Sequence, residues 1–330
     1  MALSFAPALI LYLALGDDPT RQPIVHVESD VSAGHSTEGV TAGGMQIRLF
    51  GATKKDWRVF LEAAWGSTSD ATSDAFGAAY PYDRTLRPME TYLEKMFRPG
   101  GSLLGIKAGR YRTPFGIYSR GDHAYNGFLR APLVRYGRNW AISNEFLEAG
   151  GDVLIGRPTL YVETSVGSPQ DASATSRRSG LDAVVRAQAY YRSLIVGASY
   201  LHTQPSDPRS FVRGDMVFRG VDARWMRGGL LVRGEWLDGR PFDGVATHGG
   251  YVDASLHHLG MGPVTAAVRA ERLDYDAGEF SEYIRRYTAG ARVRLTREFA
   301  ASVNLIGQPG GLSDGRRVAL DVGVTCSVRF

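Results

Sequence analysis

The last fourteen residues alternate between apolar and polar side chains and end on an aromatic residue. One face of the extended chain carries Val318, Leu320, Val322, Val324, Cys326, Val328 and Phe330, and the other carries Arg317, Asp321, Thr325, Ser327 and Arg329. A period of two over this length predicts a β-strand with one apolar and one hydrated side. The apolar side of such a strand must be buried in a core or face a membrane.

The same alternation recurs along the chain. It is clearest in residues 57–65, 160–166, 181–191, 264–271 and 287–296. A single strand of this kind also occurs in soluble sandwiches, but many in series, each about ten residues long, are typical of strands that cross a membrane at a tilt. No stretch of the sequence reaches the roughly 20 apolar residues that a transmembrane helix needs. The sequence therefore predicts that the membrane is crossed by strands.

The connections between these segments fall into two classes. Short ones are expected near residues 54–55, 98–101, 157–158, 192–193, 227–229, 260–263 and 297–298, and long ones near 33–39, 67–88, 114–144, 168–180, 204–214, 239–249, 276–284 and 308–316. Regular alternation of tight turns and longer loops is the pattern of bacterial outer-membrane barrels. We predict an all-β, antiparallel up-and-down β-barrel of about 16 strands over residues 17–330, located in the bacterial outer membrane.

The two ends of the chain carry candidate export and assembly signals. An apolar run over residues 6–15 is followed by small residues that fit a signal-peptidase site, which predicts a signal peptide over residues 1–16. No Lys or Arg precedes that run. The closing aromatic residue, Phe330, is predicted to be read by the barrel-assembly machinery. The single cysteine, Cys326, has no partner for an intrachain disulfide.

The polar faces of the predicted strands place many charges toward a lumen. The basic ones include Lys107, Arg186, Arg224, Arg233, Arg269, Arg292 and Arg294. Acidic residues share the same faces, and such a mixed wall suits a water-filled pore. Only four of the 38 basic residues are lysines. This bias has two interpretations, a GC-rich genome or the suitability of the arginine fork for anions such as phosphate.

The longest break in the alternation runs from Arg112 to Trp140. It carries the arginines Arg112, Arg120, Arg130, Arg135 and Arg138, against one acidic residue, with six aromatic residues interleaved and Tyr111 directly before it. We predict that the loop 114–144 folds into the lumen and narrows it. Its arginines would then replace the hydration of a passing anion and repel cations. The alternative is an extracellular loop whose arginines bind lipopolysaccharide phosphates.

Three segments resemble the phosphate-selective porin family. They are Gly109 to Gly116, the strand pair formed by 220–225 and 229–237, and the stretch from Tyr287 to Asn304, together with the closing Arg-Phe. The resemblance covers roughly residues 90–330 and implies a sixteen-stranded, typically trimeric, anion-selective porin. It also implies a lysine-rich eyelet that binds phosphate. With four lysines in the chain, arginine would have to supply that charge.

Signatures of other functions are absent from the sequence. There is no P-loop, Rossmann or Gly-x-Ser-x-Gly motif, and the adjacent His257 and His258 point to opposite faces of a strand. We therefore expect no enzymatic activity, no catalytic residues, no metal and no cofactor, and no nucleic-acid partner. The alternatives are an outer-membrane enzyme, with a nucleophile such as Ser255 beside a histidine and an Asn or Asp, and a non-conducting structural barrel.

The expected function is passive diffusion through a weakly anion-selective pore. The solutes would be small anionic or neutral hydrophilic molecules, including phosphate or other oxyanions. The expected partners are outer-membrane lipid and lipopolysaccharide, the barrel-assembly machinery and two further copies of the chain in a homotrimer.

Overall fold

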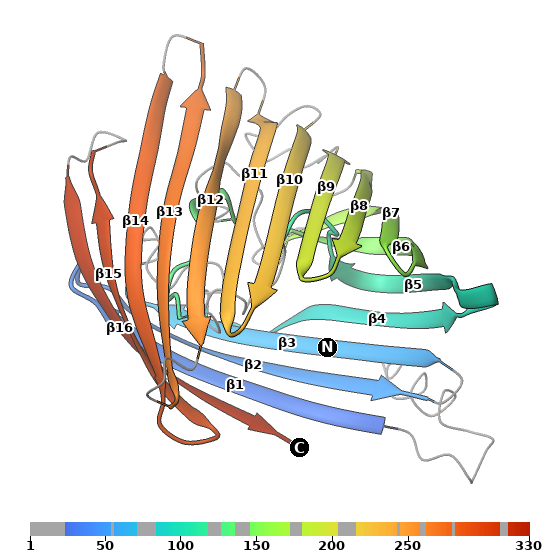
Figure 1. Cartoon of the computed structure of the whole chain (residues 1–330), viewed down its shortest axis with the longest axis horizontal. Coiled ribbons are helices and arrows are strands. Elements are labelled where there is room, and N and C mark those ends of the chain that lie inside the picture. The colour runs from blue at the N-terminus through green and yellow to red at the C-terminus, as the bar shows by residue number, and fades with distance from the viewer. Residues whose placement is uncertain are drawn as a thin grey trace.

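The chain folds into one closed barrel in which β16 pairs back with β1 (Figure 1). The computed structural model describes residues 24–53, 56–70, 84–117, 127–135, 146–171, 180–203, 216–242, 245–257, 262–278, 281–310 and 316–330. Its sixteen strands are β1 (Ile24–Ser36), β2 (Thr41–Ala52), β3 (Trp57–Thr68), β4 (Arg87–Phe97), β5 (Leu103–Arg112), β6 (Phe146–Arg157), β7 (Leu160–Asp171), β8 (Asp182–Tyr191), β9 (Leu194–Thr203), β10 (Met216–Arg227), β11 (Leu230–Phe242), β12 (Val245–His257), β13 (Val264–Asp276), β14 (Ser281–Arg294), β15 (Phe299–Gln308) and β16 (Arg317–Arg329).

Every strand pairs antiparallel with its neighbours in sequence. The predicted all-β barrel of about 16 strands is thereby confirmed. Helical structure within the described ranges is limited to two short 3₁₀ turns, η1 (Pro99–Gly101) and η2 (Leu133–Arg135). None of these described helices has the length and apolar character needed to cross a membrane. The predicted signal peptide, residues 1–16, lies outside the described residues.

The last strand closes the barrel, and it shows the two faces that its alternation predicts. Asp321, on the polar face, is fully buried inside, whereas Val318 on the apolar face is 64% exposed on the outer surface. In the closing ladder Ser36 lies opposite Asp321. The backbone of Phe330 extends this ladder by exchanging two hydrogen bonds with Val27, while its ring stays exposed. An apolar exterior of this kind suits a lipid environment.

The connections differ in part from the expected alternation of short and long. The prediction of long loops is wrong at three places, because the strands continue through most of the residues concerned. These are the ranges 33–39, 239–249 and 276–284. Their actual connections are residues 37–40, 243–244 and 277–280. Backbone pairing and cross-strand contacts, such as Asp276 opposite Ser281, extend the strands through sequence whose polar composition resembles a loop. The longest connection, residues 113–145 between β5 and β6, was correctly located.

Candidate functional site: the lumen and its internal loop

The described parts of the connection between β5 and β6 pack inside the barrel. These parts, residues 113–117 and 127–135, contain side chains that are almost completely buried. Phe115, Leu133 and Val134 belong to one apolar cluster with inward-facing residues of β8 to β14, namely Val184, Leu201, Met216, Phe218, Leu237, Tyr251, Leu273, Tyr275 and Ile284. This apolar cluster packs the loop against the inner wall formed by β8 to β14.

Small wall residues make room for the loop. A Cβ atom on Gly220 of β10 would lie 2.9 Å from two ring carbons of Phe115, and one on Gly323 of β16 would lie 2.8 Å from Cδ2 of Leu129. The wall and the loop are therefore in close contact at both glycines. Larger side chains at either position would push the loop away from the wall.

Hydrogen bonds from wall side chains satisfy the backbone of the loop. Oxygen atoms of the wall accept hydrogen bonds from backbone amides of the loop. The Gly116 amide donates to Ser199 Oγ at 3.0 Å, and the Ile117 amide donates to Glu235 Oε1 at 3.2 Å. The Leu129 amide donates to Asn304 Oδ1 at 2.7 Å, and the Leu133 amide donates to Glu271 Oε1 at 3.2 Å. Donors on the wall reach the carbonyl groups: Asn304 donates to Gly127 at 2.7 Å, Arg269 to Arg130 at 2.9 Å and Arg286 to Ala131 at 2.6 Å. A buried loop without such partners would leave costly unpaired groups, so these contacts fix its path.

Two of the five arginines predicted at the constriction form buried ion pairs. Arg112, at the end of β5, contacts Glu62 at 2.8 Å and Glu90 at 2.7 Å. Arg130, in the loop, forms a two-pronged contact with Asp321 and also reaches Glu38 at 2.7 Å. Each guanidinium is therefore matched by two carboxylates, which locks the loop entrance and the loop body onto the wall.

The other three predicted constriction residues are not placed in the same detail. Arg135 ends η2, but its side chain lies outside the described part of the chain, as do Arg120 and Arg138 entirely. Their predicted role at the constriction stays a prediction.

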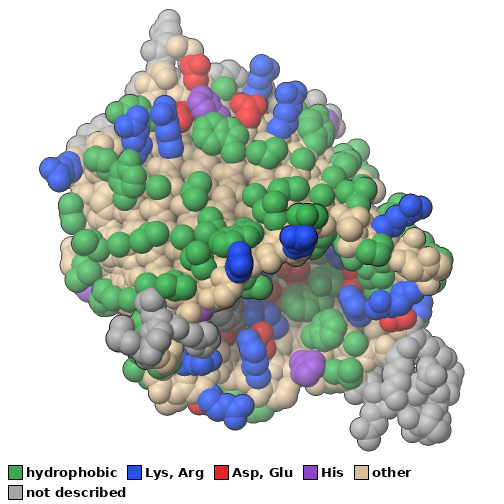
Figure 2. All heavy atoms as spheres, in the orientation of Figure 1, with side chains coloured by type: hydrophobic (Ala, Val, Ile, Leu, Met, Phe, Trp, Pro, Cys, Tyr) green, Lys and Arg blue, Asp and Glu red, His purple; other side chains and the backbone are tan. Residues whose placement is uncertain are grey.

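The predicted lumen-lining residues all lie on the inner face, and most are paired. Lys107 contacts Asp152 and Glu163, both at 3.2 Å, and Arg186 contacts Asp222 at 3.0 Å. Arg233 and Arg269 both contact Asp253, at 2.9 and 3.5 Å. In the space-filling view the molecule is hollowed near its centre, below the lower ends of β9 and β10, and side chains of both signs are visible in the hollow (Figure 2). The wall thus has the mixed character expected from the sequence.

Arg286 was missed as a functional residue, although the alternation of β14 places it on the inner face. Its side chain is 1% exposed, pairs with Glu271 and donates to the loop. The same holds for the loop-binding acceptors Ser199 and Asn304. The parity of their strands indicates an inward position, but no local signal in the sequence indicates a partner more than 80 residues away.

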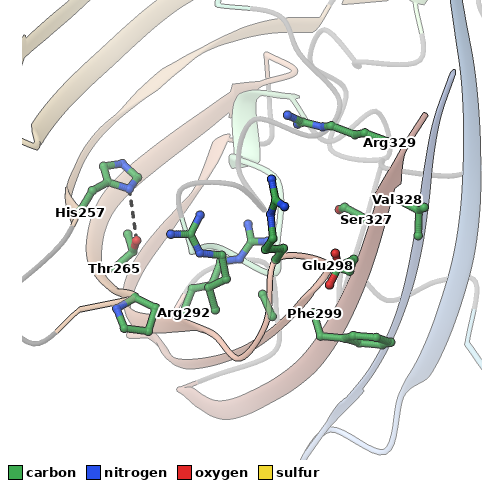
Figure 3. Close-up of a pocket in the computed structure, with 12 residues that line it drawn as sticks. His257, Thr265, Arg292, Glu298, Phe299, Ser327, Val328 and Arg329 are labelled. Atoms are coloured by element: carbon green, nitrogen blue, oxygen red, sulfur yellow. Dashed lines mark hydrogen bonds between the residues drawn. The ribbon is translucent and has the colours of Figure 1, made fainter. Parts of the chain in front are cut away.

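A cavity of about 590 Å³ opens at the turn-side end of the lumen. Its arginines are Arg292, Arg294, Arg297 and Arg329, and its only carboxylate is Glu298. Figure 3 shows Arg292 pointing into the cavity and the Phe299 ring pointing away from it. Arg329 contacts Glu28 at 2.8 Å, whereas no carboxylate in the described ranges is within salt-bridge distance of Arg294 or Arg297. This end of the lumen therefore has an excess of positive charge.

Ser255, the nucleophile of the enzyme alternative, lies beside this cavity. Its Oγ is 3.2 Å from Nε2 of His257, and Nδ1 of that ring is 3.2 Å from Oγ1 of Thr265 (Figure 3). The third position of a hydrolytic triad, normally a carboxylate, is thus occupied here by a threonine hydroxyl. Ser255 is also only 1% exposed. A substrate carbonyl has little access to it, so the geometry gives hydrolysis no support.

Comparison with known proteins identifies the fold. The sequence matches no known family model and no curated protein. Pseudomonas putida OprB aligns with a TM-score of 0.64 at 11% identity, over 94% of both chains. Salmonella typhi OmpF, in complex with daunomycin, aligns with a TM-score of 0.64 at 13% identity, over 93% of this chain and 98% of that one. The anion-selective porin of Comamonas acidovorans aligns with a TM-score of 0.57 at 11% identity, over 93% of this chain and all of that one, a coverage of 100%.

At these identities the similarity establishes the fold. The chain is a closed barrel of sixteen antiparallel strands with the architecture of bacterial outer-membrane porins. The location predicted from the sequence, the bacterial outer membrane, is the one in which proteins of this fold function. The finer resemblance to phosphate-selective porins stays a prediction.

Proposed function

We propose that the protein is a general diffusion porin that lets small hydrophilic solutes cross the bacterial outer membrane. The observation that carries the proposal is a closed barrel with a charged inner wall and a loop packed inside it. An exterior that is apolar and an interior that is polar create an aqueous path through lipid. The inward loop 114–144 would narrow that path and set a size limit.

A weak preference for anions is the second part of the proposal. It rests on the turn-side cavity, where four arginines face one glutamate. Fixed positive charge at a pore mouth raises the local concentration of anions and lowers that of cations. Because Arg112 and Arg130 are matched by carboxylates, they would act mainly by positioning the loop, while Arg120, Arg135 and Arg138 remain candidates for direct contact with anions. Phosphate and other oxyanions are candidate solutes, since the arginine fork suits them.

The proposed partners follow from the same assignment. The structure of OmpT from Vibrio cholerae described as a trimer form aligns with a TM-score of 0.57 at 10% identity, and we propose a homotrimer here. Phe330, exposed at the end of the closing strand, would be read by the barrel-assembly machinery. Lipid and lipopolysaccharide of the outer membrane would surround the barrel.

Single-channel recording of the refolded protein in a planar bilayer tests this function. We expect a steady open conductance and, under a KCl gradient, a reversal potential displaced toward that of chloride. A barrel that is folded by circular dichroism but does not conduct would refute the porin assignment and favour the structural barrel. A conducting barrel with a cation-displaced reversal potential would refute only the anion preference.

A further inference from the structure

Charged side chains form a row on the outer surface of β10 to β14, near the loop-side ends of these strands. The row contains Arg219, Asp238, Arg240, His248, Arg272, Asp274 and Arg285. Figure 2 shows basic, acidic and histidine side chains gathered at the upper ends of these strands, above a zone of hydrophobic side chains. Charges on the lipid-facing side of a barrel are costly near the middle of the membrane and tolerated near its surfaces. The row therefore marks the level of the lipid headgroups.

The strand register holds the row at one height. Arg219 lies opposite Asp238, Asp238 opposite His248, and His248 opposite Asp274. One step closer to the membrane centre, Arg272 lies opposite Arg285. With neighbouring strands about 4.8 Å apart, the five strands span roughly 19 Å. This length matches a large headgroup or a few small ones side by side.

The row has more positive than negative charge. Asp274 pairs with Arg272 at 2.6 Å, but no carboxylate among the described residues pairs with Arg285. Instead the Arg285 guanidinium lies 4.8 Å from the centre of the Tyr283 ring, and that of Arg272 lies 5.6 Å from it. The shared aromatic ring holds both guanidinium groups together on the outer surface, where they can bind an anion.

An apolar groove begins directly below these two arginines. It is an open cavity of about 800 Å³ whose floor includes Gly234, Gly250 and Ala270, with Trp236 and Tyr287 along its edges and Arg272 and Arg285 at its top. We call it the outer-wall groove. A Cβ atom on Gly250 would lie 2.9 Å from Cε3 of Trp236, so the tryptophan ring lies against the glycine.

The outer-wall groove continues toward the middle of the membrane. A second cavity of about 650 Å³ shares Val252, Ala270 and Tyr287 with it and extends along β12 to β15. The described part of β15 and β16 lacks such a cation at this level. The outward residues near the loop-side ends of these strands are Leu305 and Val318, which are 55% and 64% exposed.

We propose that the outer-wall groove binds a lipid with a phosphorylated headgroup. Its phosphate would lie on Arg272 and Arg285, and one acyl chain would fill the groove between Trp236 and Tyr287. Arginine forms paired hydrogen bonds with phosphate, and a chain seated among small residues gains packing along its length. Charge complementarity favours such a lipid over a second copy of this chain, whose net charge is +4. The inference uses the membrane location in the proposed function but not its conductance.

The test measures lipid binding to the refolded protein in a neutral detergent by native mass spectrometry. The probe is dipalmitoyl phosphatidic acid, and dipalmitoylglycerol, which lacks the phosphate, is the comparison lipid. We expect the wild type to prefer the phosphorylated lipid. The double variant Arg272→Gln/Arg285→Gln should lose about 30-fold in affinity, which corresponds to about fivefold for each arginine. Unchanged affinity in this variant would overturn the proposal.

Two further variants distinguish the contribution of the headgroup to binding from that of the groove. Ala270→Phe fills the groove and keeps both arginines in place. It should weaken the binding of the lipid but should not change the single-channel conductance. The matched control Arg157→Gln/Arg227→Gln removes two exposed arginines at the turn side and should bind as the wild type. Equal losses in the control and the test variant would show unspecific charge attraction and refute the site.

Two outcomes would assign the surface to another ligand. Displacement of the lipid by inorganic phosphate at the same concentration would show a simple ion site without a role for the groove. A change from oligomer to monomer in Ala270→Phe, with lipid binding intact, would assign the groove to a second copy of the chain. A wild-type barrel that shows no conductance would refute the porin function, but it would not affect the result on lipid binding.

Discussion

Arg130 and Asp321 form a two-pronged ion pair inside the barrel, with Nε 2.6 Å from Oδ2 and Nη2 2.9 Å from Oδ1. The two residues are 191 positions apart. Arg130 belongs to the internal loop and Asp321 to the strand that closes the barrel, and both side chains are almost completely buried. The position of the loop therefore depends on the correct closure of the barrel.

Replacement of Arg130 by Gln should destabilise the protein substantially. It leaves the buried Asp321 carboxylate without its main partner, and breaking a buried pair from one side costs about 3–5 kcal/mol. The measurement is the midpoint of urea unfolding, followed by tryptophan fluorescence. The double variant Arg130→Gln/Asp321→Asn should recover part of the loss, because it also removes the carboxylate charge. Equal stability of the single and double variants would contradict this account.

Gly220→Ala should loosen the contact between β10 and the loop. The added methyl group would meet the Phe115 ring at 2.9 Å, and overpacking of this kind costs about 1–3 kcal/mol. Gly307→Ala on β15 is the matched control, because nothing lies within 4 Å of its Cβ position. We expect a lower urea midpoint for Gly220→Ala alone, together with noisier single-channel current. Similar midpoints for the two variants would show that the glycine is not required by the loop.

Arg294→Gln/Arg297→Gln should reduce the preference for anions. Both arginines line the turn-side cavity, and their removal lowers the positive potential at the pore mouth. We expect the anion-to-cation permeability ratio to fall about two- to threefold at 0.1 M KCl. At 1 M KCl the change should largely vanish, because the Debye length shrinks to about 3 Å.

The outward-facing Arg227 at the same end of the barrel provides the control for this experiment. Arg227→Gln removes an equivalent charge from the exterior, and its reversal potential should equal that of the wild type. A shift as large as that of the double variant would mean that the cavity does not set the selectivity.

Val268→Arg should impair insertion of the barrel into lipid. Val268 is 57% exposed on the outer face of β13, and an arginine near the membrane midplane costs about 2–4 kcal/mol. Val217→Arg, in the row of charges near the loop-side end of β10, should cost at most about 1 kcal/mol. The yield of refolding into vesicles compares the two. Equal yields would contradict the assignment of the apolar exterior to the membrane.

The alternation of apolar and polar residues made the barrel predictable, because a strand places successive side chains on opposite faces. It correctly assigned Asp321 to the interior and Val318 to the exterior. It also predicted a long loop at residues 114–144, which agrees closely with the connection 113–145 in the structure. It failed for the expected loops 239–249 and 276–284. There, pairing between neighbouring strands extends the sheet through polar sequence, and local composition carries no information about such pairing.

The candidate site depended more strongly on tertiary structure. The sequence indicated that Arg130 lies in a long arginine-rich loop, but not that Asp321 and Glu38 neutralise it. Nor did it indicate that Gly220 accommodates Phe115, or that Arg272 and Arg285 share one tyrosine on the outer wall. A period of two is a local property of the chain and fixes the face of each side chain. The partner that a side chain meets across the lumen or the wall depends on barrel closure and strand register, which only the folded structure sets.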